Sequence, residues 1–183
     1  MTTELQATAR PYREVIPNGD GTGTLRLNMH WGQLAAWHSQ AREILMLSGT
    51  QSGKTSFAVD WLRREIQERG EGDYLAVTAT FPLLQLKLLP EFLLVFRDLL
   101  KLGTYRDSDK LFEYTRSRTR VIFGTATNPE SLESATAKGA VADEAGQKGF
   151  RREAREALLR RLSVHQGRIL YPTTPYGWGG WLK

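Results

Sequence analysis

The stretch Ser48-Gly49-Thr50-Gln51-Ser52-Gly53-Lys54-Thr55 decides how this chain of 183 residues folds. Residues 43–47, just before it, form a compact apolar run that predicts a buried strand. Residues 54–69, which follow, have apolar side chains at helical spacing and predict a helix. A glycine-containing loop between a strand and a helix binds phosphate, because its backbone N–H groups point inward beside the positive end of the helix.

The residue types at the end of this loop fit a bound nucleoside triphosphate. Lys54 is expected to reach the β- and γ-phosphates, and the Thr55 hydroxyl to bind Mg²⁺. The usual pattern has glycine at the place of Ser48, whereas here the glycine follows at Gly49. The cradle itself depends on Gly53, Lys54 and Thr55, so we expect all residues from 48 to 55 to contact nucleotide. The alternative is a chance Gly-Lys-Thr at a helix start.

A second signal is the run Ala140-Val141-Ala142-Asp143-Glu144, about 90 residues after the loop. A small apolar strand that ends in two carboxylates is typical of nucleotide hydrolases. Asp143 would support the metal, and Glu144 would orient and deprotonate the attacking water. Two solvated carboxylates at a strand end are the alternative.

Two weaker signals involve polar side chains near other predicted elements. Thr173 and Thr174 follow the last predicted strand, where hydroxyls beside the γ-phosphate could sense whether it is present. A proline-rich turn is the alternative for this segment. Gln33 could pair with adenine through one donor and one acceptor, and a lone surface glutamine is its alternative.

The elements around these motifs alternate between strand and helix. Helices are expected over 31–41, 54–69, 83–101 (bent at Pro90) and 151–162, and strands over 43–47, 74–80, 111–115, 120–123, 139–142 and 168–171. This alternation predicts an α/β fold, a parallel sheet with helices on both faces. We expect about five strands, with the phosphate-loop strand and the acidic-pair strand in the centre. Residues 1–28 are polar and rich in turn formers, with a turn at 18–21, and predict a loosely held arm before a domain over 29–183.

Composition narrows the possible classes of protein. Lys and Arg number 25 and Asp and Glu number 20, which gives a formal net charge of +5. That excess permits a polyanionic partner without proving one. The chain has no cysteine, which excludes disulfides and a cysteine nucleophile, and its three histidines show no metal-ligand spacing. The most apolar stretch, 81–96, is interrupted by Gln85, Lys87, Pro90 and Glu91, so no membrane span is expected.

Taken together, the motifs resemble the ATPase domain of phage large terminase subunits, the motors that package viral DNA. The resemblance rests on five stretches: 33–35, 49–55, 123–132, Asp143-Glu144-Ala145 and Thr173-Thr174-Pro175. It implies an ASCE-type P-loop NTPase fold and Mg²⁺-dependent hydrolysis of ATP that drives double-stranded DNA into the procapsid. It also implies that Gln33 contacts adenine and that Thr173 and Thr174 form the coupling motif. The implied partners are DNA, the portal protein, the small terminase subunit and further copies in a ring, in the host cytoplasm.

The sequence departs from this family in two respects. The family often has an arginine where this chain has Thr50, which cannot supply charge to a transition state. A neighbouring subunit would then have to provide one, and the candidates are Arg116, Arg118, Arg120, Arg151 and Arg152. The second departure is length, since the chain stops shortly after Thr174, before the lid and the nuclease domain of such motors. We therefore expect an ATPase domain truncated after the coupling motif.

Two other functions share these motifs. A helicase-type, DNA-dependent ATPase would use the same glutamine, phosphate loop and acidic pair. The third hypothesis is an inactive nucleotide-binding module that serves only assembly. Thr50, in place of an arginine, and the missing lid are compatible with it.

Overall fold

The computed structural model describes residues 10–128 and 136–175, so part of the predicted motif at 123–132 lies outside the described residues. The chain divides into two compact units, Met1–His38 and Ser39–Lys183. Gln33 belongs to the first unit, and the other predicted site residues belong to the second.

The first unit contains a β-hairpin in the segment for which the sequence predicted only an irregular arm. Strands β1 (Arg13–Pro17) and β2 (Gly23–Leu27) pair antiparallel. The predicted turn lies between them, closed by a hydrogen bond of 2.9 Å from Asn18 Nδ2 to Thr22 Oγ1. Helix α1 (Trp31–His38) ends the unit. The strands escaped prediction because each has only five residues and few apolar ones.

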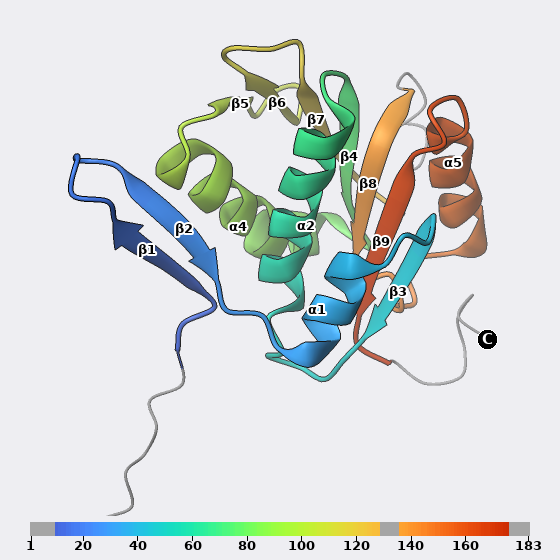
Figure 1. The fold of residues 1–183 in the computed structure, drawn as a ribbon. Coiled ribbons are helices and arrows are strands. Elements are labelled where there is room, and N and C mark those ends of the chain that lie inside the picture. The colour runs from blue at the N-terminus through green and yellow to red at the C-terminus, as the bar shows by residue number, and fades with distance from the viewer. Residues whose placement is uncertain (1–9, 129–135, 176–183) are drawn as a thin grey trace, which may run out of the picture. The chain divides into compact units, whose positions relative to one another are not determined.

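A seven-stranded sheet forms the second unit, with the order β3-β9-β8-β4-β7-β6-β5 (Figure 1). Its strands are β3 (Glu43–Leu47), β4 (Asp73–Thr78), β5 (Gly103–Arg106), β6 (Leu111–Tyr114), β7 (Arg120–Thr125), β8 (Ala137–Asp143) and β9 (Arg168–Thr173). The first five strands in this order pair parallel, while β6 pairs antiparallel with both β7 and β5. The parallel part confirms the expected fold class and strand number. The antiparallel strand β5 was not predicted.

The position of the phosphate-loop strand corrects one expectation. Among the described residues, β3 lies at the edge of the sheet rather than in its centre, since it pairs with β9 alone. The acidic-pair strand β8 is internal, as expected, and β9 lies between the two. Thr173 is the last residue of β9. Because β3, β9 and β8 run parallel, the carboxyl ends of all three motif strands lie side by side.

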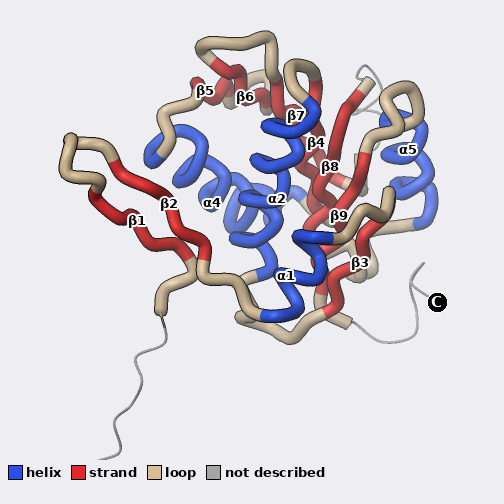
Figure 2. Tube along the Cα trace, in the orientation of Figure 1, coloured by secondary structure: helices blue, strands red, loops and turns tan. Residues whose placement is uncertain are grey.

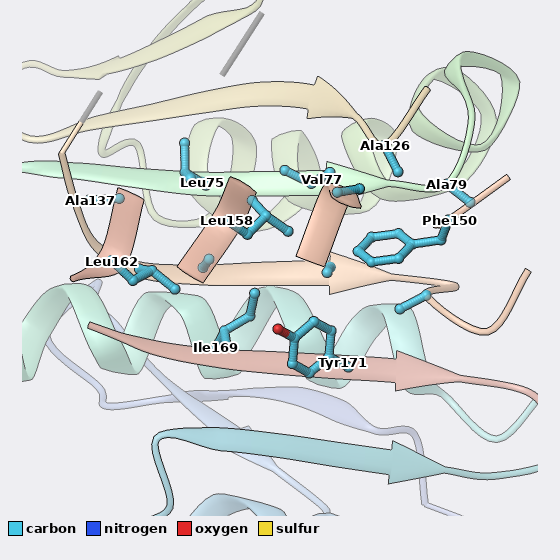
Figure 3. Packing of buried hydrophobic residues seen from close by; sticks show 14 residues of the cluster. Leu75, Val77, Ala79, Ala126, Ala137, Phe150, Leu158, Leu162, Ile169 and Tyr171 are labelled. Atoms are coloured by element: carbon cyan, nitrogen blue, oxygen red, sulfur yellow. The ribbon is translucent and has the colours of Figure 1, made fainter. Parts of the chain in front are cut away.

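Helices cover both faces of this sheet (Figure 2). Helix α2 (Lys54–Arg69) lies on one face, and α5 (Arg152–Leu162) lies on the other. Figure 3 shows Leu158 and Leu162 of α5 directed toward β8 and β9, where they pack in one cluster with Ile169 and Tyr171. The spans of β3 and α2 are those that the sequence predicted.

The predicted helix over 83–101 is a composite of four short pieces. It consists of α3 (Phe81–Leu83), a π-helical turn η1 (Leu84–Leu88), α4 (Leu89–Leu93) and a second π-helical turn η2 (Leu94–Leu99). Phe92 stacks on Phe96 at 3.8 Å and meets Phe112 and Phe123 edge-on, which joins this segment to β6 and β7. Pro90 is the second residue of α4, directly after the π-helical turn η1 ends at Leu88. No helix among the described residues is both long and apolar enough to cross a membrane.

Candidate nucleotide-binding site

The phosphate loop connects β3 to α2 and curls through two left-handed residues. Gly53 has φ of 72° and Gln51 has φ of 60°. Glycine adopts this conformation without strain, whereas a non-glycine residue there marks a constrained segment. The Oγ atoms of Ser48 and Ser52 lie 2.8 Å apart, so the serine that replaces the usual glycine hydrogen-bonds across the loop. Gly49 has open space where a side chain would stand.

Lys54 begins helix α2 with a buried side chain. Its Nζ donates to the backbone oxygen of Gly49 at 2.6 Å and to that of Ser48 at 3.5 Å. The ammonium group is therefore held against the loop that the sequence predicted to cradle phosphates. Helix α2 has no side-chain cap at this end, which leaves its first N–H groups available to an anion.

Thr55 and Asp143 meet although they are 88 residues apart in the sequence. The Thr55 hydroxyl donates to Asp143 Oδ2 at 2.8 Å, which joins the phosphate loop to the end of β8. Burial raises the pKa of Asp143 to about 6, against the opposing effect of this hydrogen bond. A hydroxyl beside a carboxylate is a donor set that fits Mg²⁺, which takes few protein ligands when substrate phosphates and water complete its shell. Accordingly, no cluster of three acidic, histidine or cysteine side chains is found among the described residues.

Glu144 follows Asp143 in a left-handed backbone conformation, with φ of 55°. Its N–H lies 2.8 Å from the oxygen of Pro172 and 3.1 Å from Asp143 Oδ1, and these bonds hold the turn. Its side chain is only 7% exposed. Oε2 accepts a long hydrogen bond of 3.5 Å from the N–H of Thr174, and Oε1 lies 3.8 Å from Nζ of Lys87. Strained backbone of this kind is concentrated at functional sites.

The two adjacent threonines of the predicted coupling motif have different surroundings in the structure. The Thr173 side chain is fully buried, accepts a hydrogen bond of 2.8 Å from the N–H of Gly146 and donates to the oxygen of Thr174. Thr173 therefore ties the acidic-pair loop to β9. Thr174 lines the cavity beside Glu144, and its own hydroxyl is buried without a hydrogen-bond partner. Of the two threonines, only Thr174 lines the cavity.

These elements enclose one cavity of about 350 Å³. Residues of the phosphate loop, the first turn of α2, η1, the acidic pair and the position after β9 line it: Thr50, Gln51, Ser52, Gly53, Lys54, Thr55, Ser56, Lys87, Glu144 and Thr174. Seven of the residues that the sequence predicted for nucleotide binding line this cavity, namely residues 50–55 and Thr174, together with the predicted base, Glu144. Ser48, Gly49 and Thr173 were also predicted but do not line it. Asp143 reaches the same place through Thr55.

Gln33 belongs to the first unit, in α1. Its Oε1 accepts a hydrogen bond of 3.1 Å from the N–H of His30, close to the helix start. Contact between Gln33 and adenine stays a prediction.

The five candidate arginines lie outside the cavity of their own chain, and two of them form ion pairs with carboxylates. Arg116, Arg118 and Arg120 lie in or next to the β6–β7 turn, where β7 begins, at the edge of the sheet opposite the cavity. Arg120 forms a two-pronged ion pair with Asp73, with both N···O distances at 2.7 Å. Arg152 pairs with Glu156 one turn along α5. None of these five residues lines the cavity.

Sequence reasoning missed two cavity residues, Ser56 and Lys87. Ser56 directly follows the predicted loop, whereas Lys87 comes from a separate segment. The only signal was that Lys87 interrupts the apolar stretch 81–96, which served to exclude a membrane span. The position of Lys87 beside Glu144 depends on the π-helical turn η1. The sequence predicted a helix over 83–101 but not this turn.

Comparison with solved structures identifies the fold. The large terminase ATPase domain of Thermus phage P74-26 superposes with a TM-score of 0.70 at 20% identity, over 84% of this chain and 67% of that domain. The chain has the fold of a phage large terminase ATPase domain. The large terminase of another thermophilic bacteriophage gives a TM-score of 0.65 at 14% identity, over 78% of this chain and 38% of that one. This second terminase has also been solved in complex with ADP and with ATP-γ-S.

A helicase shares the fold to a lesser degree. The UvsW helicase of bacteriophage T4 superposes with a TM-score of 0.56 at 15% identity, over 82% of this chain and 54% of the helicase. No family model matches the chain, and no curated protein matches its sequence. The terminase fold therefore rests on three-dimensional similarity.

Proposed function

We propose that this chain is the ATPase domain of a viral DNA-packaging motor and hydrolyses ATP with Mg²⁺. The observation that carries the proposal is the 2.8 Å hydrogen bond between Thr55 and Asp143, which unites the phosphate loop with the acidic pair. The terminase fold supports the same reading, as do the nucleotide complexes of the thermophilic phage terminase.

The predicted site residues have separate parts in the proposed reaction. Lys54 and the loop N–H groups bind the phosphates. Thr55 and Asp143 would hold Mg²⁺, which would neutralise negative charge that develops on the phosphates. Glu144 accepts the proton of the attacking water. Thr174 lies next to Glu144 and would report the loss of the terminal phosphate to β9, while Thr173 would transmit that change through Gly146.

The proposed partners follow from the motor reading. Double-stranded DNA is the translocated substrate, and the +5 net charge is compatible with a polyanion. The portal protein, the small terminase subunit and further copies of this chain in a ring would complete the motor in the host cytoplasm.

Glu144→Gln provides the direct test of the mechanism. Glutamine keeps the size and hydrogen-bonding capacity of the side chain but cannot take a proton at this site. We expect the hydrolysis rate to fall by about 100-fold or more, with ATP binding retained. Phosphate release and binding of a fluorescent ATP analogue measure the two quantities, and Glu71→Gln, at an exposed glutamate, is the matched control.

Two results would contradict the proposal. Hydrolysis by Glu144→Gln at the parent rate would exclude Glu144 as the base. ATP binding without turnover by the parent, even with portal protein and DNA, would favour an inactive assembly module.

The helicase alternative is favoured by the likeness to UvsW. The two functions differ in what happens to DNA, since a packaging motor moves a duplex that stays paired. Separation of strands in a duplex with a single-stranded tail would support the helicase, whereas displacement of a bound block from an intact duplex would support the motor.

A further inference from the structure

Lys87 brings a second ammonium group into the nucleotide cavity. It lies in η1, a segment separate from the phosphate loop and from the acidic pair, and it lines the same cavity as both. Among the described residues that line the cavity, the charged side chains are Lys54, Lys87 and Glu144. Within that lining, Lys87 is therefore the one cation that the predicted motifs do not contain.

The site needs positive charge beyond that of Lys54. Phosphoryl transfer spreads negative charge over the oxygens of the terminal phosphate, and enzymes of this kind place an additional cation against it. Thr50 cannot provide one, and within this chain Lys87 is the other cation among the described residues that line the cavity. Lys54 already donates to two carbonyl oxygens of its own loop.

The contact between Lys87 and Glu144 leaves the lysine able to move. Its Nζ lies 3.8 Å from Glu144 Oε1, which is too long for a hydrogen bond, and its side chain is 51% exposed. Half-exposed ion pairs contribute little to stability. Lys87 is therefore not needed to hold the fold, but its charge lies in the same cavity as the phosphate loop and 3.8 Å from the proposed base, Glu144.

The backbone that presents Lys87 is also unusual. η1 is a π-helical turn, a rare conformation that is found mostly at functional sites. Leu84 and Leu88 of the same turn are buried, each at 1% exposure, so the turn is anchored to the core while Lys87 projects toward the cavity.

We infer that Lys87 is a catalytic residue whose ammonium group contacts the terminal phosphate of bound ATP, in place of the arginine that the phosphate loop lacks. The inference rests on the proposed function. Without nucleotide, Lys87 neutralises Glu144. When ATP binds, the ammonium group turns to a phosphate oxygen, and Glu144 is released to accept the proton of water.

Comparison of Lys87→Ala and Lys87→Arg with the parent tests this role. We expect Lys87→Ala to lower kcat by about 100-fold, the effect of removing one preorganised group that stabilises transition-state charge. Because the contact is to the terminal phosphate, binding of ATP should weaken by about tenfold while binding of ADP stays within about twofold. Lys87→Arg should retain most of both properties. Lys101→Ala, at an exposed lysine just beyond η2, is the matched control.

The two binding measurements separate the possible failures. A parent that binds no nucleotide overturns the proposed function together with this inference. A parent that binds and hydrolyses ATP, with Lys87→Ala equal to it, overturns the inference alone. Equal weakening of ATP and ADP binding by Lys87→Ala, with a lower melting temperature, would show a structural role and would also overturn it.

Discussion

Asp143 combines two properties that oppose each other in the folded protein. It is almost completely buried, which disfavours its charged form, yet its proposed role at a metal requires that charge. Burial raises its pKa to about 6 from 3.8, although the Thr55 hydroxyl partly offsets this by donating to Oδ2. The carboxyl group is therefore poised to lose its proton when a cation arrives.

This raised pKa predicts how stability depends on pH without metal. Between about pH 4 and pH 6 the folded state binds a proton at Asp143 that the unfolded state has released, so the free energy of unfolding should fall as pH rises through this range. A shift of this size corresponds to about 3 kcal/mol. Urea unfolding of the parent and of Asp143→Asn at several pH values measures the effect.

The Asn variant serves as the control because its side chain does not titrate. We expect the fall between pH 4 and pH 6 to be about 3 kcal/mol smaller in Asp143→Asn than in the parent. Parallel stability profiles for the two proteins would show that Asp143 does not carry the dependence.

At the scale of elements, a buried ion pair fixes α2 to β9. Arg168 Nη1 lies 2.9 Å from Glu65 Oε1, and the guanidinium group also donates to the backbone oxygens of Ser39 and Ala41. Glu65 is fully buried and bonds to Arg69 as well, at 2.8 Å. These contacts hold the helix that follows the phosphate loop against the strand that leads to Thr173 and Thr174.

Removal of one partner should therefore cost much more than removal of a surface charge. We expect Arg168→Ala to destabilise the protein by about 3–5 kcal/mol, because Glu65 would keep a buried charge with less compensation. Arg160→Ala, at an exposed position of α5, should change stability by no more than about 0.5 kcal/mol. Thermal and urea unfolding compare the two, and equal effects would contradict this account of the ion pair.

At the scale of the second unit, α5 closes the face of the sheet opposite α2. Leu158 is fully buried and packs among residues of β4, β8 and β9, as Figure 3 shows. Much of the cluster beneath it consists of alanine, so α5 approaches the strands closely and few side chains can move to fill a gap.

Leu158→Ala should then leave a cavity and cost about 2–5 kcal/mol in the free energy of unfolding. Leu86→Ala is the control, because Leu86 is 79% exposed on η1 and loses little contact when shortened. Chemical unfolding of both variants measures the difference. A loss below about 1 kcal/mol in Leu158→Ala would show that the face relaxes around the gap.

The sequence predicted the local parts of this protein well and its long-range arrangement less well. β3 and α2 have the predicted bounds because an apolar run, a glycine-containing loop and a helical repeat are encoded within a few residues of one another. The hairpin β1–β2 and the strand β5 were missed because short strands with few apolar residues have weak patterns. The edge position of β3 was mispredicted because strand order depends on which strands pair, which no local pattern records.

The sequence by itself determined the phosphate loop, the acidic pair and the alternation that makes a parallel α/β sheet. Each of these follows from residue types and spacing within one segment. Only the tertiary structure decided that Thr55 meets Asp143, that Thr174 rather than Thr173 faces the cavity, and that Lys87 stands beside Glu144. These relations join residues from separate strands and helices, and their distances are set by the packing of the whole sheet.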